Sequence, residues 1–327
     1  MKRSHSTFGE HADRSDPGAR VTSLDSSPDT DDLVAALNQV ALPDSVAHGS
    51  MSLPVVVGID SGGTWLRVVA YDLQGHPVRR VTERGGRAEA GVDLIGIAVP
   101  VFTECLHGLR VLAAAATNAV NIQDAWRAAR VGGPPLTTMS EAVLAAVPTA
   151  ASAVVVIAGT GSAAATVLGG CELLVTGGKG DAAETGCGTW LGRQAALAVR
   201  DGRLADPWAT QITETVKQFQ IDVGSPKVAG LAPVVTAAAA AGDQWALSVC
   251  EQAAQDLAAL LDVHDVNRFA PTGIVTVGSV ISPSTPVGVM FQAHATRRGV
   301  TVAQHLPDLT GRAVEWAAAG LAARYPR

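Results

Sequence analysis

Hydrophobic and polar positions along the chain follow the same arrangement twice. Residues 55–83 and 154–178 each begin with a Val-rich run, pass through a short turn of Gly and hydroxyl residues, and continue into two further strand-like segments. Because β-branched residues favour strands and Gly clusters favour turns, each copy predicts a strand–turn–strand–turn–strand unit. Only the first copy carries a carboxylate at its first turn, Asp60, so the two copies are not equivalent.

Strand-like and helix-like segments alternate through the rest of the chain. Strands are expected at residues 54–59, 65–71, 76–83, 109–116, 136–139, 154–157 and 273–277, and the second repeat extends to residue 176. Helices are expected at 99–109, 121–129, 141–146, 189–200 and 308–325, and residues 207–262 look helical apart from breaks at 224–226 and 242–243. This alternation is typical of an α/β protein.

The chain has 327 residues, which is enough for two modest domains. We expect one domain over residues 53–150 and the other over 151–308, with a closing helix over 309–327 that is placed to pack on the first. Residues 1–30 are rich in Ser, Asp, Gly, Pro and Arg, a composition typical of segments that do not fold. A short helix is expected between Asp31 and Pro43, so residues 1–52 are predicted to be a disordered or loosely attached extension.

Composition narrows the range of partners. The net charge is −6 and no basic stripe occurs, which argues against nucleic acid or an anionic membrane surface as a partner. The four cysteines lie far apart without a CxxC spacing, which is typical of reduced thiols in the cytosol. No apolar run approaches the ~18 residues that a membrane span needs, and the N-terminus lacks the apolar core of a secretion signal. We therefore expect a soluble, cytoplasmic protein.

The first turn has the chemistry of a phosphate site. Its Gly residues let the backbone approach an anion closely, so that successive N–H groups can cradle phosphate oxygens. The Thr hydroxyl adds a donor, and Asp60 at the strand end can hold Mg²⁺ directly or through water. The turn consists of Asp60, Ser61, Gly62, Gly63 and Thr64. Taken alone, these residues are equally typical of an ordinary hairpin turn.

Two later segments repeat this logic. The turn of the second copy offers Gly159, Thr160, Gly161 and Ser162 for a phosphate, and a third strand runs into Gly278 and Ser279, where a small residue leaves room for a base or ribose. No GxxxxGK[ST] motif occurs, which excludes a P-loop, and neither turn is a GxGxxG that opens a helix.

In this order, the three segments resemble the phosphate-1, phosphate-2 and adenosine motifs of the actin-like ATPase and sugar-kinase superfamily. More narrowly, residues 54–325 resemble the BadF/BadG/BcrA/BcrD-type family, especially its N-acetylglucosamine kinase and actinobacterial glucosamine kinase members. Supporting stretches are IAGTGS (157–162), TWLGRQA (189–195) and VGSVISPSTPVG (277–288). The resemblance implies a two-domain ribonuclease H-like fold of the actin/hexokinase type. It also implies ATP and Mg²⁺ in the cleft between the domains, a sugar or amino-sugar acceptor, and a possible homodimer.

The acceptor side departs from these relatives. The family's catalytic base is an Asp that opens a helix about 20 residues before the phosphate-2 turn, and Glu141 stands in that place. A Glu here is equally typical of a helix N-terminus. In the family's Gly-Asp-Glu-Gly acceptor segment, Glu184 and Gly186 match, the preceding Asp is replaced by Ala183, and Asp181 is a candidate to compensate. A second acceptor loop, at residues 85–89, lacks the family's Asn.

Three functions remain open at this point. The first is an ATP-dependent kinase for a sugar or amino sugar, with Asp60 and Glu141 as its catalytic carboxylates. The second is a nucleotide-binding protein of the same fold that has lost catalysis and regulates. The third is an ATPase that acts on a protein partner, as the family's dehydratase activators do, although the local cysteine pattern of those activators is absent.

Overall fold

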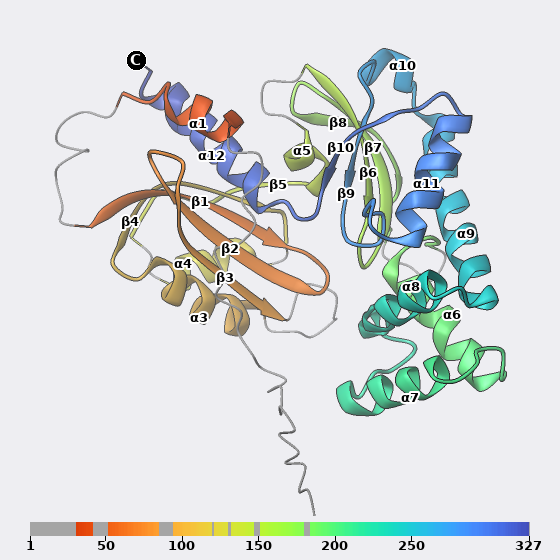
Figure 1. Cartoon of the computed structure of the whole chain (residues 1–327). Helices are drawn as coiled ribbons and strands as arrows, with labels where there is room; N and C mark the ends of the chain where they lie inside the picture. The colour runs from red at the N-terminus through yellow and green to blue at the C-terminus, as the bar shows by residue number, and fades with distance from the viewer. Residues whose placement is uncertain are drawn as a thin grey trace, which may run out of the picture.

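Two five-stranded sheets, each covered by helices, make up the protein (Figure 1). The structure is a computed structural model and describes residues 31–41, 52–84, 94–119, 121–129, 132–146, 151–179 and 184–326. Strands and helices alternate along the chain, which confirms the predicted α/β class. None of the helices in these ranges is long and apolar enough to cross a membrane.

The first sheet has the strand order β3-β2-β1-β4-β5. Strands β1, β2 and β3 are antiparallel neighbours, while β4 and β5 run parallel to β1. Its strands are β1 (Leu53–Ser61), β2 (Trp65–Asp72), β3 (Pro77–Arg84), β4 (Leu109–Thr117) and β5 (Thr137–Met139). The alternation of buried residues along β1 separates two cores: Val55, Val57 and Ile59 pack towards α3 (Leu94–Leu106) and α4 (Ile122–Ala128), and Val56 packs towards α12 (Thr310–Arg324).

The second sheet repeats this topology. Its order is β10-β9-β6-β7-β8, in which β6, β7 and β8 are antiparallel and β9 and β10 run parallel to β6. The strands are β6 (Ser152–Ala158), β7 (Ser162–Leu168), β8 (Cys171–Gly177), β9 (Ile274–Val277) and β10 (Val302–Leu306). The helices are α5 (Glu141–Ala145), α6 (Gly188–Arg200), α7 (Trp208–Phe219), α8 (Ala232–Ala240), α9 (Gln244–Ala259), α10 (Val266–Phe269) and α11 (Pro286–Arg297), with 3₁₀ turns at Pro226–Leu231 and Leu260–Val263.

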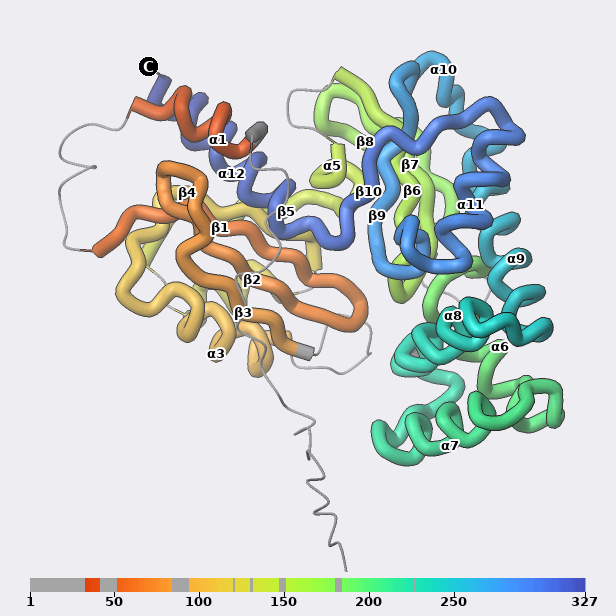
Figure 2. Tube along the Cα trace, in the orientation of Figure 1, coloured from red at the N-terminus to blue at the C-terminus, as the bar shows by residue number. Residues whose placement is uncertain are grey.

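The chain returns to the first sheet after completing the second. From β10 it passes directly into α12, whose Val314, Ala317 and Leu321 are buried against the first sheet. The N-terminal helix α1 (Asp31–Leu37) lies beside α12, so the two ends of the described chain lie together (Figure 2). A bridge between Val40 and Pro326 joins them.

Most predicted strands agree with the structure to within a few residues, and the helical run at 207–262 breaks near the predicted positions. The prediction of a helix at 99–109 was wrong in its bounds, because α3 already begins at Leu94 and accommodates Pro100 inside it. The N-terminal helix stops at Leu37, well before Pro43. Strand β10 was missed because its sequence, VAQHL, has neither a β-branched run nor a clear apolar alternation.

Candidate functional site

The first predicted turn lies at the carboxyl end of β1. Asp60 and Ser61 are the last residues of this strand, and Asp60 is paired across the hairpin with Arg67 of β2. The backbone N–H of Ser61 donates to the hydroxyl oxygen of Thr117 at the end of β4, over 2.6 Å. The turn is therefore fixed to the neighbouring parallel strand, at the edge where the parallel strands of the first sheet all end.

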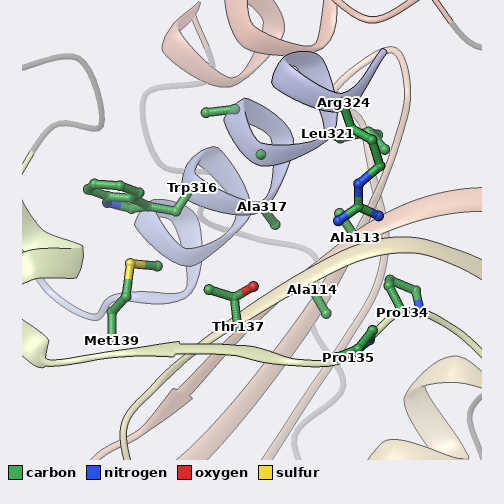
Figure 3. Close-up of a pocket in the computed structure, with 12 residues that line it drawn as sticks. Ala113, Ala114, Pro134, Pro135, Thr137, Met139, Trp316, Ala317, Leu321 and Arg324 are labelled. Atoms are coloured by element: carbon green, nitrogen blue, oxygen red, sulfur yellow. The ribbon is translucent and has the colours of Figure 1, made fainter.

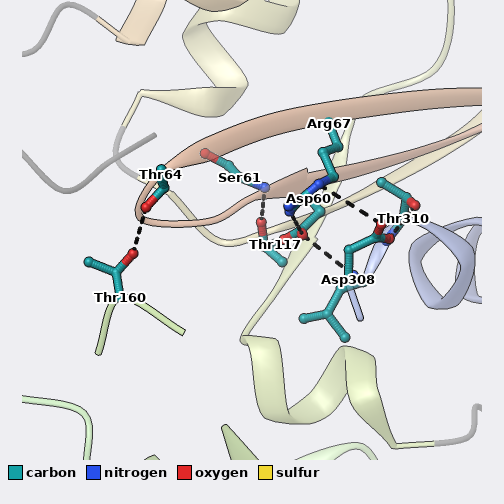
Figure 4. Close-up of polar contacts among 9 residues, drawn as sticks. Asp60, Ser61, Thr64, Arg67, Thr117, Thr160, Asp308 and Thr310 are labelled. Carbon is teal, nitrogen blue, oxygen red and sulfur yellow. Dashed lines mark hydrogen bonds and ion pairs between the residues drawn. The ribbon is translucent and has the colours of Figure 1, made fainter. Parts of the chain in front are cut away.

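Asp60 is buried and contacts both β2 and the connection from β10 to α12 (Figure 4). Its Oδ2 accepts from Arg67 Nη1 at 3.1 Å and from the backbone N–H of Leu309 at 3.4 Å. Burial raises the pKa of the Asp60 carboxyl above its ordinary value, against the opposing effect of the Arg67 guanidinium. Asp308 adds to this rise in pKa through its negative charge. Asp60 is thus a carboxylate whose charge is costly to bury and which gains from a nearby cation.

The second predicted turn is held by the segment that follows its hairpin. The carbonyls of Gly159 and Thr160 accept from the backbone N–H groups of Gly188 and Thr189, at 2.8 and 3.0 Å, where α6 begins. The backbone N–H of Ser162 donates to Glu184 Oε2 at 3.2 Å. The carboxylate at the second turn, Glu184, therefore comes from outside the hairpin, whereas the carboxylate at the first turn, Asp60, belongs to the hairpin itself.

The two turns touch each other. Thr64 Oγ1 and Thr160 Oγ1 lie 3.0 Å apart and share a hydrogen bond (Figure 4). A Cβ atom at Gly63 would lie 2.5 Å from Thr160 Oγ1, so no larger residue fits at this position without a shift. The sequence requirement for Gly at position 63 follows from this close approach between the two sheets.

The third predicted segment joins the second turn. Gly278 has a φ of 103°, and a Cβ atom there would lie 2.6 Å from the carbonyl oxygen of Ala158. The backbone N–H of Val280 donates to that same oxygen at 3.1 Å. Ser279 lies between them and is exposed. The structure therefore brings all three predicted nucleotide segments together, two by direct contact between the sheets and the third through the end of β6.

Glu141 is the first residue of α5, which directly follows β5. Because β1, β4 and β5 are neighbours and parallel, Glu141 lies at the same sheet edge as Asp60, two strand spacings or roughly 10 Å away. The preceding residue, Ser140, caps the helix by accepting from the N–H of Val143 at 3.2 Å, and its hydroxyl donates to Glu172 on β8 at 2.6 Å. A helix that begins beside β5 is thereby tied to the second sheet.

The predicted acceptor residues do not form one group. Glu184 contacts the second turn, whereas Gly186 lies against α9, where a Cβ atom would meet the carbonyl oxygen of Ala253 at 2.7 Å. Asp181 and Ala183 lie outside the described residues, as does the loop at 85–89.

Sequence analysis missed three residues that surround Asp60: Arg67, Thr117 and Asp308. Arg67 could have been found from the hairpin register, because residues equidistant from the turn pair across it. Asp308 lies in the connection between β10 and α12, and its Oδ1 accepts from the N–H of Thr310 at 2.9 Å and from the Thr310 hydroxyl. Its approach to Arg67 joins residues too distant in the sequence for any local pattern to indicate.

The side chains around Asp60 show whether the predicted Mg²⁺ could bind there. This ion favours oxygen ligands and is usually held by one or two carboxylates together with phosphates and waters. In the described part of the chain, no three His, Cys, Asp or Glu side chains gather to hold a metal. One buried carboxylate at the end of β1, with the hydroxyls of Thr64 and Thr160 on the adjoining turns, fits an ion that arrives with a nucleotide.

A separate cavity of about 320 Å³ lies between α12 and the β4–β5 edge (Figure 3). Trp316, Leu321 and Arg324 line it on the helix side, and Pro134, Thr137 and Met139 line it on the sheet side. None of the predicted site residues contributes to it. The cavity is therefore distinct from the turns around Asp60.

No protein-family model matches the chain, and no curated protein sequence matches it significantly. Solved structures do match. A candidate N-acetylglucosamine kinase from Porphyromonas gingivalis has a TM-score of 0.61 and 16% identity, over 80% of this chain and 98% of its own. A ROK family glucokinase from Streptomyces griseus, in complex with glucose and AMPPNP, has a TM-score of 0.52 and 20% identity, over 83% of this chain and 99% of its own. A ROK family transcriptional regulator, described as a homologue of the E. coli MLC protein, has a TM-score of 0.53 and 14% identity, over 89% of this chain and 87% of its own.

At these identities the likeness shows the fold alone. Together with the two sheets of identical topology, it confirms the predicted two-domain fold of the actin/hexokinase type. The likeness is to the sugar-kinase superfamily as a whole and does not separate the BadF/BadG branch from the ROK branch. The protein therefore has the fold of the actin-like ATPases and sugar kinases.

Proposed function

We propose that this protein transfers the γ-phosphoryl group of Mg–ATP to a hydroxyl group of a sugar or amino sugar. One observation carries the proposal: the three segments with the chemistry of a nucleotide site converge, through the Thr64–Thr160 contact and the seating of Gly278 on Ala158. Segments so far apart in the sequence do not meet in this way by local turn chemistry alone.

In this proposal each segment has a separate role. The two turns bind the phosphates of ATP through backbone N–H groups and hydroxyls, and Asp60 binds the Mg²⁺ that arrives with them. The ion supplies neutralisation of the charge that develops on the transferred group. Gly278 and Ser279 leave room for the nucleoside. Glu141 accepts the proton of the acceptor hydroxyl, because it is the carboxylate that opens a helix at the same edge as Asp60.

An amino sugar, glucosamine or N-acetylglucosamine, is the proposed acceptor class. The support is the resemblance to the BadF/BadG-type kinases in sequence and the name of the Porphyromonas gingivalis neighbour. Asp181, Glu184 and Gly186 are the proposed acceptor residues, of which Asp181 lies outside the described residues.

The first experiment measures ADP release from Mg–ATP with a panel of glucosamine, N-acetylglucosamine, glucose, other amino sugars and cyclitols. Release that depends on one acceptor class supports the kinase and names its substrate. Absence of release with every acceptor, while ATP binding is measurable by calorimetry, contradicts it.

The role of Glu141 has its own test. Glu141→Gln keeps the shape of the side chain and removes the base, so phosphoryl transfer should fall at least ~100-fold while ATP affinity is unchanged. Glu172→Gln is a matched control, because this exposed carboxylate lies beside the same helix through Ser140. Undiminished transfer in Glu141→Gln would remove it as the base.

A second function, nucleotide-dependent regulation without catalysis, is favoured by a specific observation. The protein's own charges already lie at both turns: Arg67 pairs with Asp60, and Glu184 lies on the N–H of Ser162. One structural neighbour is described as a transcriptional regulator, so the fold supports such a role elsewhere. ATP binding without acceptor-dependent turnover would favour this second function.

A further inference from the structure

One guanidinium lies between two carboxylates that come from different parts of the fold (Figure 4). Arg67 Nη1 is 3.1 Å from Asp60 Oδ2, and Arg67 Nε is 3.9 Å from Asp308 Oδ2. Arg67 and Asp60 belong to the first hairpin, whereas Asp308 lies in the connection from β10 to α12. The cation is therefore close to a partner on its own hairpin and to a second partner that the other sheet delivers.

The two carboxylates are prepared for different tasks. Asp308 is oriented by the first residue of α12, because its Oδ1 accepts from the N–H and the hydroxyl of Thr310, which leaves Oδ2 directed at Arg67. Asp60 is the more deeply buried of the two side chains, 8% exposed against 21% for Asp308. The Asp308 carboxylate is thus held in a fixed orientation and is better solvated, whereas the Asp60 carboxylate is less solvated.

A divalent ion at Asp60 would change which of the two carboxylates pairs with Arg67. In the described arrangement Arg67 neutralises Asp60, and a cation added at the same carboxylate would meet the guanidinium as a like charge at short range. Arg67 is 26% exposed and has a long side chain, so it is able to move. Asp308 Oδ2, at 3.9 Å, is the nearest other carboxylate oxygen that the structure shows for it.

We infer that Asp308 is a positioning residue that takes up Arg67 when a Mg–nucleotide binds, and thereby frees Asp60 for the metal. This inference rests on the proposed nucleotide site. It assigns to the β10–α12 connection a role in metal binding, although that connection contributes no metal ligand itself.

The connection is well placed for this role. Leu309, the residue after Asp308, donates its backbone N–H to Asp60 Oδ2, and Leu306 at its start accepts from the N–H of Gly278 at 3.0 Å. The segment from Leu306 to Thr310 therefore touches both the carboxylate of the first turn and the third nucleotide segment. Its position, and with it that of Asp308, depends on both sheets.

The test compares metal dependence with nucleotide affinity. Calorimetry measures the affinity for AMPPNP over a series of Mg²⁺ concentrations and in EDTA, in wild type and in Asp308→Asn. Asn keeps an oxygen that can accept from Thr310 but loses the charge that attracts Arg67. We expect the half-saturating Mg²⁺ concentration to rise roughly fivefold, with metal-free AMPPNP affinity unchanged or higher.

The double variant separates this inference from a simple charge effect. With Arg67→Gln in the background, Asp308→Asn should cause no further change in Mg²⁺ dependence, because the cation that it positions is gone. A shift of the same size in that background would overturn the inference, since it would mean that Asp308 attracts the metal directly. Asp124→Asn is the matched control, because it removes an exposed Asp–Arg pair elsewhere on the first domain and should shift nothing.

The outcomes also distinguish this inference from the proposed function. Wild type that binds Mg–AMPPNP, combined with unchanged Mg²⁺ dependence in Asp308→Asn, overturns the inference alone. A fall in melting temperature without a change in Mg²⁺ dependence likewise overturns it and leaves Asp308 with a structural role, through its hydrogen bonds to Thr310. Wild type that binds no AMPPNP overturns the nucleotide site and the inference with it.

Discussion

The hairpin that begins each sheet has the same topology, but the charged side chains at the two turns come from different places in the chain. In the first, Asp60 and Arg67 belong to the hairpin itself and pair across its strands. In the second, the turn carries no charged side chain, and its carboxylate, Glu184, comes from the segment before α6. Both copies therefore share one backbone topology, whereas the charged side chains at their turns differ.

This difference shows which parts of such a site a fold determines. The topology places two turns against each other, and a hydroxyl from each turn lies at their contact. It does not decide where a carboxylate lies. The predictions below test whether the two charges have the different roles that their origins suggest, with Asp60 serving the metal and Glu184 holding the second turn.

The largest effect is expected at the first turn. Asp60→Asn should lower kcat/KM for phosphoryl transfer at least ~100-fold, because it removes the charge that we propose holds the metal at the phosphates. The variant should fold, since a buried carboxylate with a raised pKa is not a net source of stability at neutral pH. Kinetics with saturating Mg–ATP and circular dichroism check the two parts. Asp72→Asn, which changes a half-buried carboxylate at the far end of the same hairpin, is the control. Retained turnover in Asp60→Asn would contradict the metal assignment.

A smaller effect of opposite sign is expected at the second turn. Glu184→Gln keeps an oxygen that can accept from Ser162 but removes a negative charge beside the proposed phosphate site, so ATP affinity should rise about two- to fivefold. Calorimetry with ATP in the absence of acceptor measures this. Loss of the proposed contact of Glu184 with the acceptor should in addition raise the KM for the acceptor, and a constant ATP affinity would mean that Glu184 does not act on the phosphates.

The contact between the turns is testable by a double-mutant cycle. Thr64→Val and Thr160→Val each remove one hydroxyl of the pair at 3.0 Å, and their effects on the free energy of unfolding should couple by about 1 kcal/mol. Urea denaturation of the two single variants and the double variant gives the coupling. Additive effects would mean that the two hydroxyls do not stabilise each other in solution.

The last prediction concerns His264, a histidine that packs against the second hairpin. His264 is buried between the hydroxyls of Thr166 on β7 and Thr176 on β8, at 2.7 and 3.0 Å. Burial lowers the pKa of His264 below its ordinary value of 6.5, so the unfolded chain binds this proton more readily than the folded one. Stability should therefore be full above pH 6.5 and decline as the pH falls below it, by no more than about 1.4 kcal/mol per pH unit for one group.

Melting temperatures between pH 5 and 8 check this, with His264→Gln as the variant. The decline should become shallower in the variant but not vanish, because burial also lowers the pKa of His305. An unchanged decline would assign the pH dependence to other groups.

The sequence indicated the parts of this site that are local. The strand-to-turn junction at Asp60 and the Gly-rich turns are recognisable because their requirements lie within a few neighbouring residues. Arg67 needed one further step, the register of the hairpin. Leu309 meets Asp60 across 249 positions of the chain, and no pattern in the sequence records that meeting. The same holds for Glu184, whose contact with Ser162 depends on how the segment before α6 folds back.

The return of α12 to the first sheet has a consequence for how the protein is made. During synthesis, β1 to β5 leave the ribosome before the whole of the second sheet, and the helix that buries Val56 on the other face of β1 follows only after β10. The first domain is therefore unable to complete its core while it is the only part of the chain available. A fragment that stops at residue 146 would expose that apolar face, so the two halves must mature together rather than one after the other.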